Sequence, residues 1–344
     1  MAIPKIYYDA IKDEWVVVHN ETESGAICFG DCTGSSGGNG NCTGSLPCGD
    51  TGVFGGGYKD NNLSTIDYIT ISTLGNAQNF GNLTVARQGL AANSNGTNDR
   101  GVFGGGNNGN ALSTIDYITI STPGNAQNFG NLSVARYGLS ATSNGTNDRG
   151  VFGGGYDDNY LTTIDYITIS TPGNAQNFGN LTVERYGVAA TSNGVNDRGV
   201  FGGGRNSSYI FKTIDYITIS TPSNAQNFGD LTAYLAQLAA TSNGINNRGV
   251  FGCGYDVNGS LNYFIEYITI STPSNTKKFG ELDPRSELTA TSNGTKDRGV
   301  FGGGQDGTED LESIRYITIS TPSDTLYFGD LTNRKSRLSA TSNA

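Results

Sequence analysis

The segment TSNGTNDRGVFGGG, residues 142–155, recurs with small changes along the chain. Its core GVFGGG, or a close copy, begins at Gly52, Gly101, Gly150, Gly199, Gly249 and Gly299. The spacings between these copies are 49, 49, 49, 50 and 50 residues. A period near fifty residues indicates repeated units that cannot bury their apolar faces singly and therefore stack into one body.

The composition of the 344-residue chain favours strands over helices. Hydrophobic residues make up 35% and charged residues 15% of the chain, and 51 positions are glycine. Glycine, Ser, Thr and Asn are poor residues for helix interiors, whereas Tyr, Phe, Ile, Val and Thr suit half-buried strands. We therefore expect an all-β protein with one repeat domain over residues 51–344.

One repeat, residues 138–186, contains four short strand-like segments separated by turn signals. The segments are GLSATSN, GVFGGG, TIDYITIST and QNFGNLT. Asn144-Gly145 is a hairpin signal, and Pro172-Gly173 suits the centre of a type II turn. Each repeat therefore predicts a four-stranded antiparallel meander. The third segment lacks polar alternation, so we expect both of its faces to be buried between stacked meanders.

Four-stranded units repeated about every fifty residues are typical of a β-propeller, a ring of blades that leaves few open strand edges. The repeats starting near 52, 101, 150, 199, 249 and 299 predict six blades. The first repeat begins at its second strand, while the chain ends on LSATSNA, residues 338–344, which is the sequence of a first strand. We therefore expect residues 338–343 to pair beside residues 52–57, so that both ends of the chain close the ring.

The order of segments resembles the kelch repeat family, over about 290 residues. Kelch repeats carry an Arg before a small-residue strand, paired glycines at the end of the second strand, a Tyr in the third and an aromatic in the fourth. Here these are Arg136, Gly153–Gly155, Tyr166 and Phe178, with Phe where kelch repeats usually have Trp. The resemblance implies a six-bladed kelch-like propeller.

Other recurring residues have structural explanations. One copy reads GVFGCG, so we expect only the outer two glycines of each triplet to need angles that other residues avoid. The Arg of the Asp-Arg pairs is expected to bind turn carbonyls or an adjacent blade; the alternative is a ring of charges for a ligand. The pairs are Asp99-Arg100, Asp148-Arg149, Asp197-Arg198 and Asp297-Arg298. A catalytic ring is not expected at Asp67, Asp116, Asp165 and Asp215, because Glu266 and then Arg315 replace this Asp in the last two blades.

The repeats differ mainly in segments that an antiparallel blade places on one face, which we call the variable face. These are the loops between second and third strands and the connections between fourth and first strands, near 85–89, 233–237, 283–287 and 333–337. Loops on a rigid scaffold commonly carry recognition, and large aromatic residues anchor sugars and proteins. The alternative is that these loop sequences have drifted without constraint and bind nothing. The predicted binding residues are Tyr58, Tyr156, Tyr209, Phe211, Tyr255, Tyr263 and Phe264.

Residues 1–50 differ from the repeats and form a short β and loop extension with a Gly/Ser/Cys-rich linker. Tyr7, Tyr8, Trp15, Val16, Val17 and Val18 are predicted to anchor the propeller; the alternative is a strand that merely covers it. Cys28, Cys32, Cys42 and Cys48 are disulfide candidates, with free thiols or a metal site as alternatives, since their spacing does not match paired zinc knuckles.

Charge and motifs exclude several classes of function. The net charge of −10 disfavours nucleic acid, and no apolar run approaches the length of a membrane span. The first residues also lack a secretory signal. No nucleophile elbow or phosphate loop is present, and the two histidines of kelch-like copper oxidases are missing, because His19 is the single His. We expect no enzyme, cofactor or metal, although the acidic loops YDDN and QDGTED leave calcium as an alternative.

Repeats of the form RGVFGGG…TIDYITIST…NAQNFGNLTVARYGLAATS are similar to those of kelch-like structural proteins of tailed bacteriophages, often cyanophages and other marine phages. This resemblance implies a virion component, such as a head or tail fibre or a capsid decoration protein. Such a protein is made in the host cytoplasm and becomes extracellular after lysis. Its expected partners are other virion proteins, bound through residues 1–50, and a host surface glycan or protein, with assembly into oligomers. The alternatives are an intracellular kelch adaptor and a carbohydrate-active enzyme.

Overall fold

The computed structural model describes residues 5–9, 14–18, 49–95, 99–144, 148–193, 197–243, 247–293 and 297–343. The chain divides into two compact units, Met1–Gly30 and Asp31–Ala344. In the first unit, β1 (Lys5–Asp9) pairs antiparallel with β2 (Glu14–Val18), which confirms the expected N-terminal β segment. The candidate disulfide residues Cys28, Cys32, Cys42 and Cys48 lie outside the described residues.

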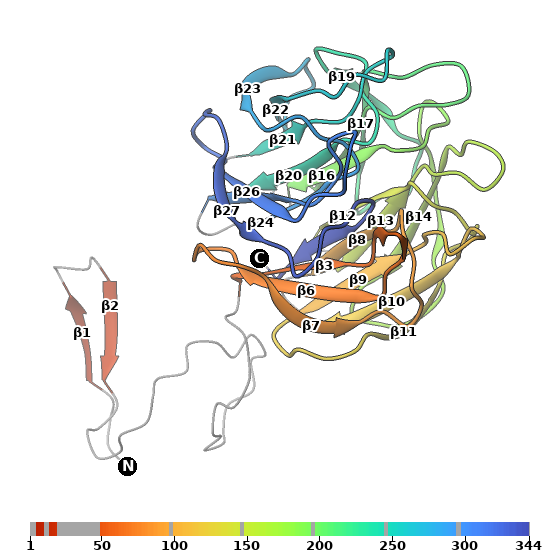
Figure 1. The fold of residues 1–344 in the computed structure, drawn as a ribbon. Coiled ribbons are helices and arrows are strands. Elements are labelled where there is room, and N and C mark those ends of the chain that lie inside the picture. Colours follow the sequence, from red (N-terminus) through yellow and green to blue (C-terminus); the bar gives the residue numbers. More distant parts are fainter. Residues whose placement is uncertain are drawn as a thin grey trace. The chain divides into compact units, whose positions relative to one another are not determined.

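The second unit contains six four-stranded antiparallel sheets, the blades of a propeller (Figure 1). From the innermost strand outward, the first three blades are β28 (Ser339–Ser342), β3 (Thr51–Gly55), β6 (Thr65–Thr70), β7 (Gln78–Asn82); β8 (Ala91–Asn95), β9 (Arg100–Gly104), β10 (Thr114–Thr119), β11 (Gln127–Asn131); and β12 (Ser140–Asn144), β13 (Arg149–Gly153), β14 (Thr163–Thr168), β15 (Gln176–Asn180). The last three are β16 (Ala189–Asn193), β17 (Arg198–Gly202), β18 (Thr213–Thr218), β19 (Gln226–Asp230); β20 (Ala239–Asn243), β21 (Arg248–Gly252), β22 (Phe264–Thr269), β23 (Lys277–Glu281); and β24 (Thr289–Asn293), β25 (Arg298–Gly302), β26 (Ser313–Thr318), β27 (Leu326–Asp330). A small hairpin, β4 (Tyr58–Lys59) and β5 (Asn61–Asn62), lies in the loop after β3.

The ring is closed by strands from opposite ends of the chain. β28 pairs antiparallel with β3, with Ser339 opposite Gly55 and Ser342 opposite Gly52. Figure 1 shows the blue C-terminal strand returning beside the orange strands of the first blade. The N–H of Asn343 donates to the carbonyl of Thr51 at 3.2 Å and extends this pairing. The predicted six-bladed ring and its closure by residues 338–343 are confirmed.

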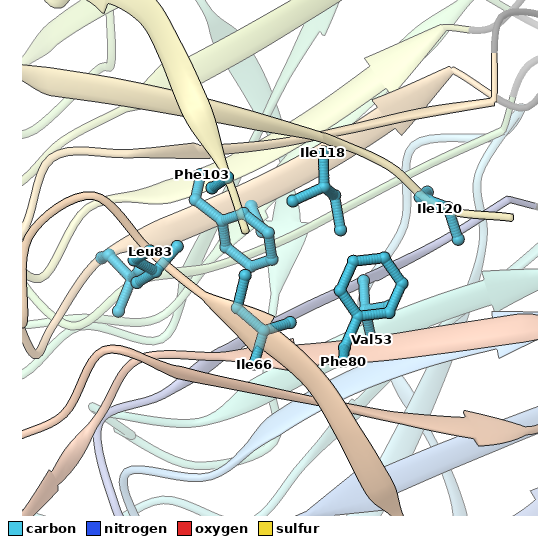
Figure 2. Packing of buried hydrophobic residues seen from close by; sticks show 10 residues of the cluster. Val53, Ile66, Phe80, Leu83, Phe103, Ile118 and Ile120 are labelled. Atoms are coloured by element: carbon cyan, nitrogen blue, oxygen red, sulfur yellow. The ribbon is translucent and has the colours of Figure 1, made fainter. Parts of the chain in front are cut away.

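Apolar side chains are buried between blades. Figure 2 shows the cluster in which Val53, Ile66 and Phe80 of the first blade meet Phe103 and Ile118 of the second. Five equivalent clusters join the other neighbouring blades, including one that joins the last blade to the first. The innermost strands bring mainly small residues to the axis, where they line a pocket. The expected placement of small residues near the axis and large ones farther out is confirmed.

The glycine triplets correct one prediction, because the middle and last glycines need left-handed angles. Gly154 has a φ of +70° and Gly155 a φ of +114°, and a Cβ on Gly154 would lie 2.7 Å from the Arg185 carbonyl. The first glycine is a strand residue whose missing Cβ admits the Phe ring of the next blade. Cys253 takes the middle position at a φ of 62°. The connection it faces is one residue shorter than in the third blade, and the Cys253 thiol reaches the Asp283 carbonyl in it at 3.8 Å.

The predicted type II turn at Pro172-Gly173 is wrong. The turn closes one step earlier, where the N–H of Thr171 donates to the carbonyl of Thr168 at 3.1 Å. Gly173 does not have the positive φ that a type II turn requires. Residues 172–175 instead reach the preceding blade, where the N–H of Ala175 donates to the carbonyl of Asn131 at 2.8 Å. Each such turn therefore covers the outer strand edge of its neighbour, which protects that edge from pairing with another chain.

The recurring charged residues also hold neighbouring blades together. Arg100 donates to the carbonyls of Ile169 and Ser170 in the next blade, at 3.0 and 2.7 Å, as expected for the Asp-Arg pairs. In the third strands, Asp165 is fully buried and accepts a hydrogen bond at 3.0 Å from Arg136, which lies in the connection between the second and third blades. Burial lowers the pKa of Arg136, and the Asp165 charge raises it. The equivalent pairs are Arg87–Asp116, Arg185–Asp215 and Lys335–Asp67.

Candidate functional site

Six residues, one from each blade, form a closed ring of backbone hydrogen bonds around the propeller axis. Each lies two residues before an innermost strand, and its N–H donates to the carbonyl of its counterpart in the preceding blade at 2.7–3.0 Å. The members of this axial ring are Gly89, Gly138, Gly187, Gln237, Glu287 and Arg337. The bond from Gly89 to Arg337 completes the circle. All six residues line one pocket together with Tyr186.

The axial ring has sixfold backbone geometry but breaks the sixfold pattern in its side chains. All six residues adopt a left-handed backbone conformation, with φ between 54° and 67°. Three blades place glycine there, whereas Gln237, Glu287 and Arg337 occupy the other three positions. A non-glycine residue in such a conformation costs on the order of 1–3 kcal/mol. The three polar side chains are therefore present at a cost in stability that glycine would avoid.

The residues before the axial ring pair with the loops that follow the second strands. The bridged pairs are Ser336–Tyr58, Gln88–Asn107, Tyr137–Tyr156, Tyr186–Arg205, Ala236–Tyr255 and Ser286–Gln305. These bridges confirm that the two kinds of variable segment meet on one face. The surroundings of the axial ring are thus built from the parts of the repeats that differ most.

Four tyrosines gather beside the glycine half of the axial ring. Tyr137 lies edge-to-face with both Tyr156 and Tyr186, at centroid distances of 5.7 and 5.6 Å. The ring centroid of Tyr160 lies 5.0 Å from that of Tyr156. A Cβ on Gly138 would lie only 2.0 Å from Cε2 of Tyr186, so the glycine makes room for this aromatic ring. We call Tyr137, Tyr156, Tyr160 and Tyr186 the tyrosine cluster.

Polar groups border the other half of the axial ring. The Nε of Arg337 donates to a carboxylate oxygen of Glu287 at 2.7 Å, and its NH1 donates to Oε1 of Gln88 at 2.9 Å. Gln237 donates through Nε2 to the hydroxyl oxygen of Tyr186 at 3.2 Å. The site therefore combines aromatic surfaces with fixed donors and acceptors, the combination that suits a ligand with both apolar faces and hydroxyl groups.

Arg205 adds a positive charge to the tyrosine cluster. Its guanidinium lies 5.6 Å from the ring centroid of Tyr186, and its backbone pairs with Tyr186 in both directions at 2.9 Å. Its Nε is buried and has no hydrogen-bond partner within the described ranges.

Three tyrosines at the site, Tyr137, Tyr186 and Tyr255, have a raised pKa, which favours the neutral phenol. Burial raises the pKa of Tyr186, while the hydrogen bond from Gln237 acts in the opposite direction. Burial is also the main cause that raises the pKa of Tyr137 and of Tyr255; the Arg205 charge lowers the pKa of Tyr255 and the Glu287 charge raises it. Neutral phenols can both donate and accept hydrogen bonds, so they suit a hydroxyl-rich ligand.

The structure divides the seven predicted binding residues into two groups. Tyr58, Tyr156 and Tyr255 are bridged to the connections around the axial ring. Tyr209 is 68% and Tyr263 41% exposed, and both lie in loops outside the tyrosine cluster. Phe264 begins β22 and lies 4.2 Å from the Tyr263 ring. Phe211 pairs through its backbone with Gly204 and Leu235.

Sequence reasoning missed several residues of the site, namely Tyr137, Tyr160, Tyr186, Arg205, Gln237, Glu287 and Arg337. A signal for three of them was present, because aligned repeats show Gly, Gly, Gly, Gln, Glu and Arg at one position. Tyr137 and Tyr186 share the position just before it. Only the fold shows that this position surrounds the axis.

Comparisons with known protein families and with curated proteins find no match for this chain. In the described part of the chain, no group of three or more His, Cys, Asp or Glu side chains is placed to hold a metal ion. The same part contains no helix with the length and apolar character needed to span a bilayer.

Proposed function

We propose that this chain is a non-enzymatic structural protein of a tailed-phage virion, whose kelch-like propeller makes exterior contacts and binds the host surface through its variable face. It belongs to a head or tail fibre or decorates the capsid. It is made in the host cytoplasm, leaves the cell in the particle, and docks on other virion proteins through residues 1–50. The resemblance of the repeats to phage structural proteins supports this assignment.

The observation that carries the binding role is the break in symmetry at the axial ring. In the strands the blades largely repeat the same residues, and recurring charges such as Arg136 and Asp165 are engaged between blades. Around the axis, by contrast, three blades replace glycine with Gln237, Glu287 and Arg337 at left-handed positions. Three different polar side chains kept at strained positions, where the other three blades have glycine, support a role in recognition.

Particle fractionation tests the structural role. Phage particles are purified on a density gradient, washed in high salt and analysed by quantitative peptide mass spectrometry. The chain is expected at a fixed ratio to the major capsid protein through every wash. Its loss in the first wash would exclude a structural role and favour an intracellular adaptor.

Removal of residues 1–22 tests the anchoring role of Tyr7, Tyr8, Trp15 and Val16–Val18. The truncated chain is expected to retain the thermal melt of the full chain but to be missing from particles. Normal incorporation would show that the anchor lies elsewhere.

A further inference from the structure

Arg205 has no carboxylate partner and no side-chain hydrogen bond among the described residues. Every other described arginine donates a side-chain hydrogen bond or forms an ion pair, either between blades, as Arg136 does, or on the variable face, as Arg337 does. Arg205 forms no ion pair with any described residue and lies instead over the Tyr186 ring. This is unexpected in a chain whose 31 acidic residues outnumber its 21 Lys and Arg.

A guanidinium with free donors matches one class of ligand group. Its planar fork of N–H donors fits the two oxygens of a carboxylate, or of a sulfate ester, better than it fits single hydroxyls. The surrounding groups suit the rest of a sugar, since the tyrosine cluster offers aromatic surfaces, and Gln237 and Glu287 offer partners for hydroxyls.

We propose that the axial site binds the acidic terminal sugar of a surface glycan, with Arg205 pairing the acidic group and the tyrosine cluster contacting the sugar ring. This inference rests on the proposed binding role of the variable face and names its ligand. The net charge of −10 repels a polyanion, so the ligand carries an isolated negative charge rather than a continuous series of charges.

Binding of the full chain to a glycan array tests the proposal. The array carries oligosaccharides ending in glucuronate, galacturonate, sialate or a sulfated sugar, each beside its neutral parent. The unmodified chain is expected to bind one acidic glycan at least tenfold more tightly than its parent, with the sulfated and carboxylated probes separating the two acidic groups.

Two variants test whether Arg205 supplies the positive charge that pairs with the acidic group of the ligand. Arg205→Gln is expected to weaken binding of the acidic probe by roughly 10- to 100-fold, the factor for a lost charge-assisted pair, and to change binding of the neutral parent much less. Arg334→Gln is the matched control, because Arg334 belongs to a connection of the variable face but pairs with Glu309. It makes the same change in net charge and should bind as the unmodified chain does.

The outcomes separate this inference from the binding role itself. Equal binding of acidic and neutral probes, or equal effects of Arg205→Gln and Arg334→Gln, would overturn the acidic ligand while leaving glycan binding in place. Binding to no glycan on the array would overturn the inference, and retained binding to host cells would then indicate a protein receptor. Thermal melts of both variants exclude unfolding as the cause of lost binding.

Discussion

Leu338→Ala tests whether the ring is closed. Leu338 belongs to the segment that enters β28 and is 5% exposed. It packs in the cluster that joins the last blade to the first, together with Phe54, Phe328 and Leu331. In an open arrangement of the same repeats this cluster would not form, and Leu338 would lie in an exposed tail.

The structure supplies both the magnitude and a control. Leu288 takes the equivalent place between the fifth and sixth blades and is 6% exposed, within a cluster that does not depend on closure. Removing a buried Leu side chain beyond Cβ costs about 2–5 kcal/mol. Because the two sites match in burial and packing, Leu338→Ala and Leu288→Ala should lower the free energy of unfolding by similar amounts within that range.

Urea denaturation of the full chain and both variants, followed by far-ultraviolet circular dichroism, measures the two losses. An unchanged slope of the unfolding free energy against urea concentration would show that the variants expose the same surface on unfolding. A loss below about 0.5 kcal/mol for Leu338→Ala beside a loss above about 2 kcal/mol for Leu288→Ala would refute closure through the C-terminal strand. Small losses for both would refute the packing between blades.

The remaining predictions concern buried and titrating groups. Arg136→Leu should lower the free energy of unfolding in urea by about 3–5 kcal/mol, because it leaves Asp165 buried without its cation. Adding Asp165→Asn should recover part of that loss, and no recovery would contradict the pairing. Burial raises the pKa of Cys253 to about 12. Its thiol should therefore resist iodoacetamide at pH 8 until the protein unfolds, as followed by mass spectrometry of its own peptide, and rapid labelling of the native chain would contradict its burial. Hydrogen bonds from Thr308 and from the Glu309 backbone lower the pKa of Asp306 to about 2. These contacts therefore stabilise the loop fully at pH values above the ordinary aspartate pKa, and this stabilisation is lost as the pH falls through about 2. Carboxyl titration by NMR should show that Thr308→Ala raises this pKa, and an unchanged value would remove the hydroxyl as its cause.

Much of the fold was predictable because its signals are local and repeated. The spacing of GVFGGG gave the number of blades, and LSATSNA at the end of the chain showed which strand was missing from the first blade. The carbonyl-binding role of Arg100 and its equivalents was also predictable from the recurring Asp-Arg pairs, because a planar donor with a neighbouring acceptor commonly fixes a turn.

The errors arose where a neighbouring segment determines the conformation. Cys253 suggested that the middle of each glycine triplet is unstrained, yet it adopts the same left-handed angle beside a shortened connection. Pro172-Gly173 has the sequence of a type II turn, but these residues extend to reach the preceding blade.

The candidate site was harder to predict because its residues come from different blades. Tyr186 and Arg205 are adjacent only through a bridge between two loops, and Glu287 meets Arg337 across two blades. An unpaired Arg205 is visible only after the partners of all other described arginines are known.

A crystal structure of the full chain with the tightest-binding acidic oligosaccharide would show whether the broken symmetry around the axis forms the binding site. We expect the terminal sugar to lie against the tyrosine cluster, with its acidic group on the guanidinium of Arg205. A ligand bound between blades, at the pockets beside Tyr117 or Tyr166, or on the face opposite the axial ring, would contradict it.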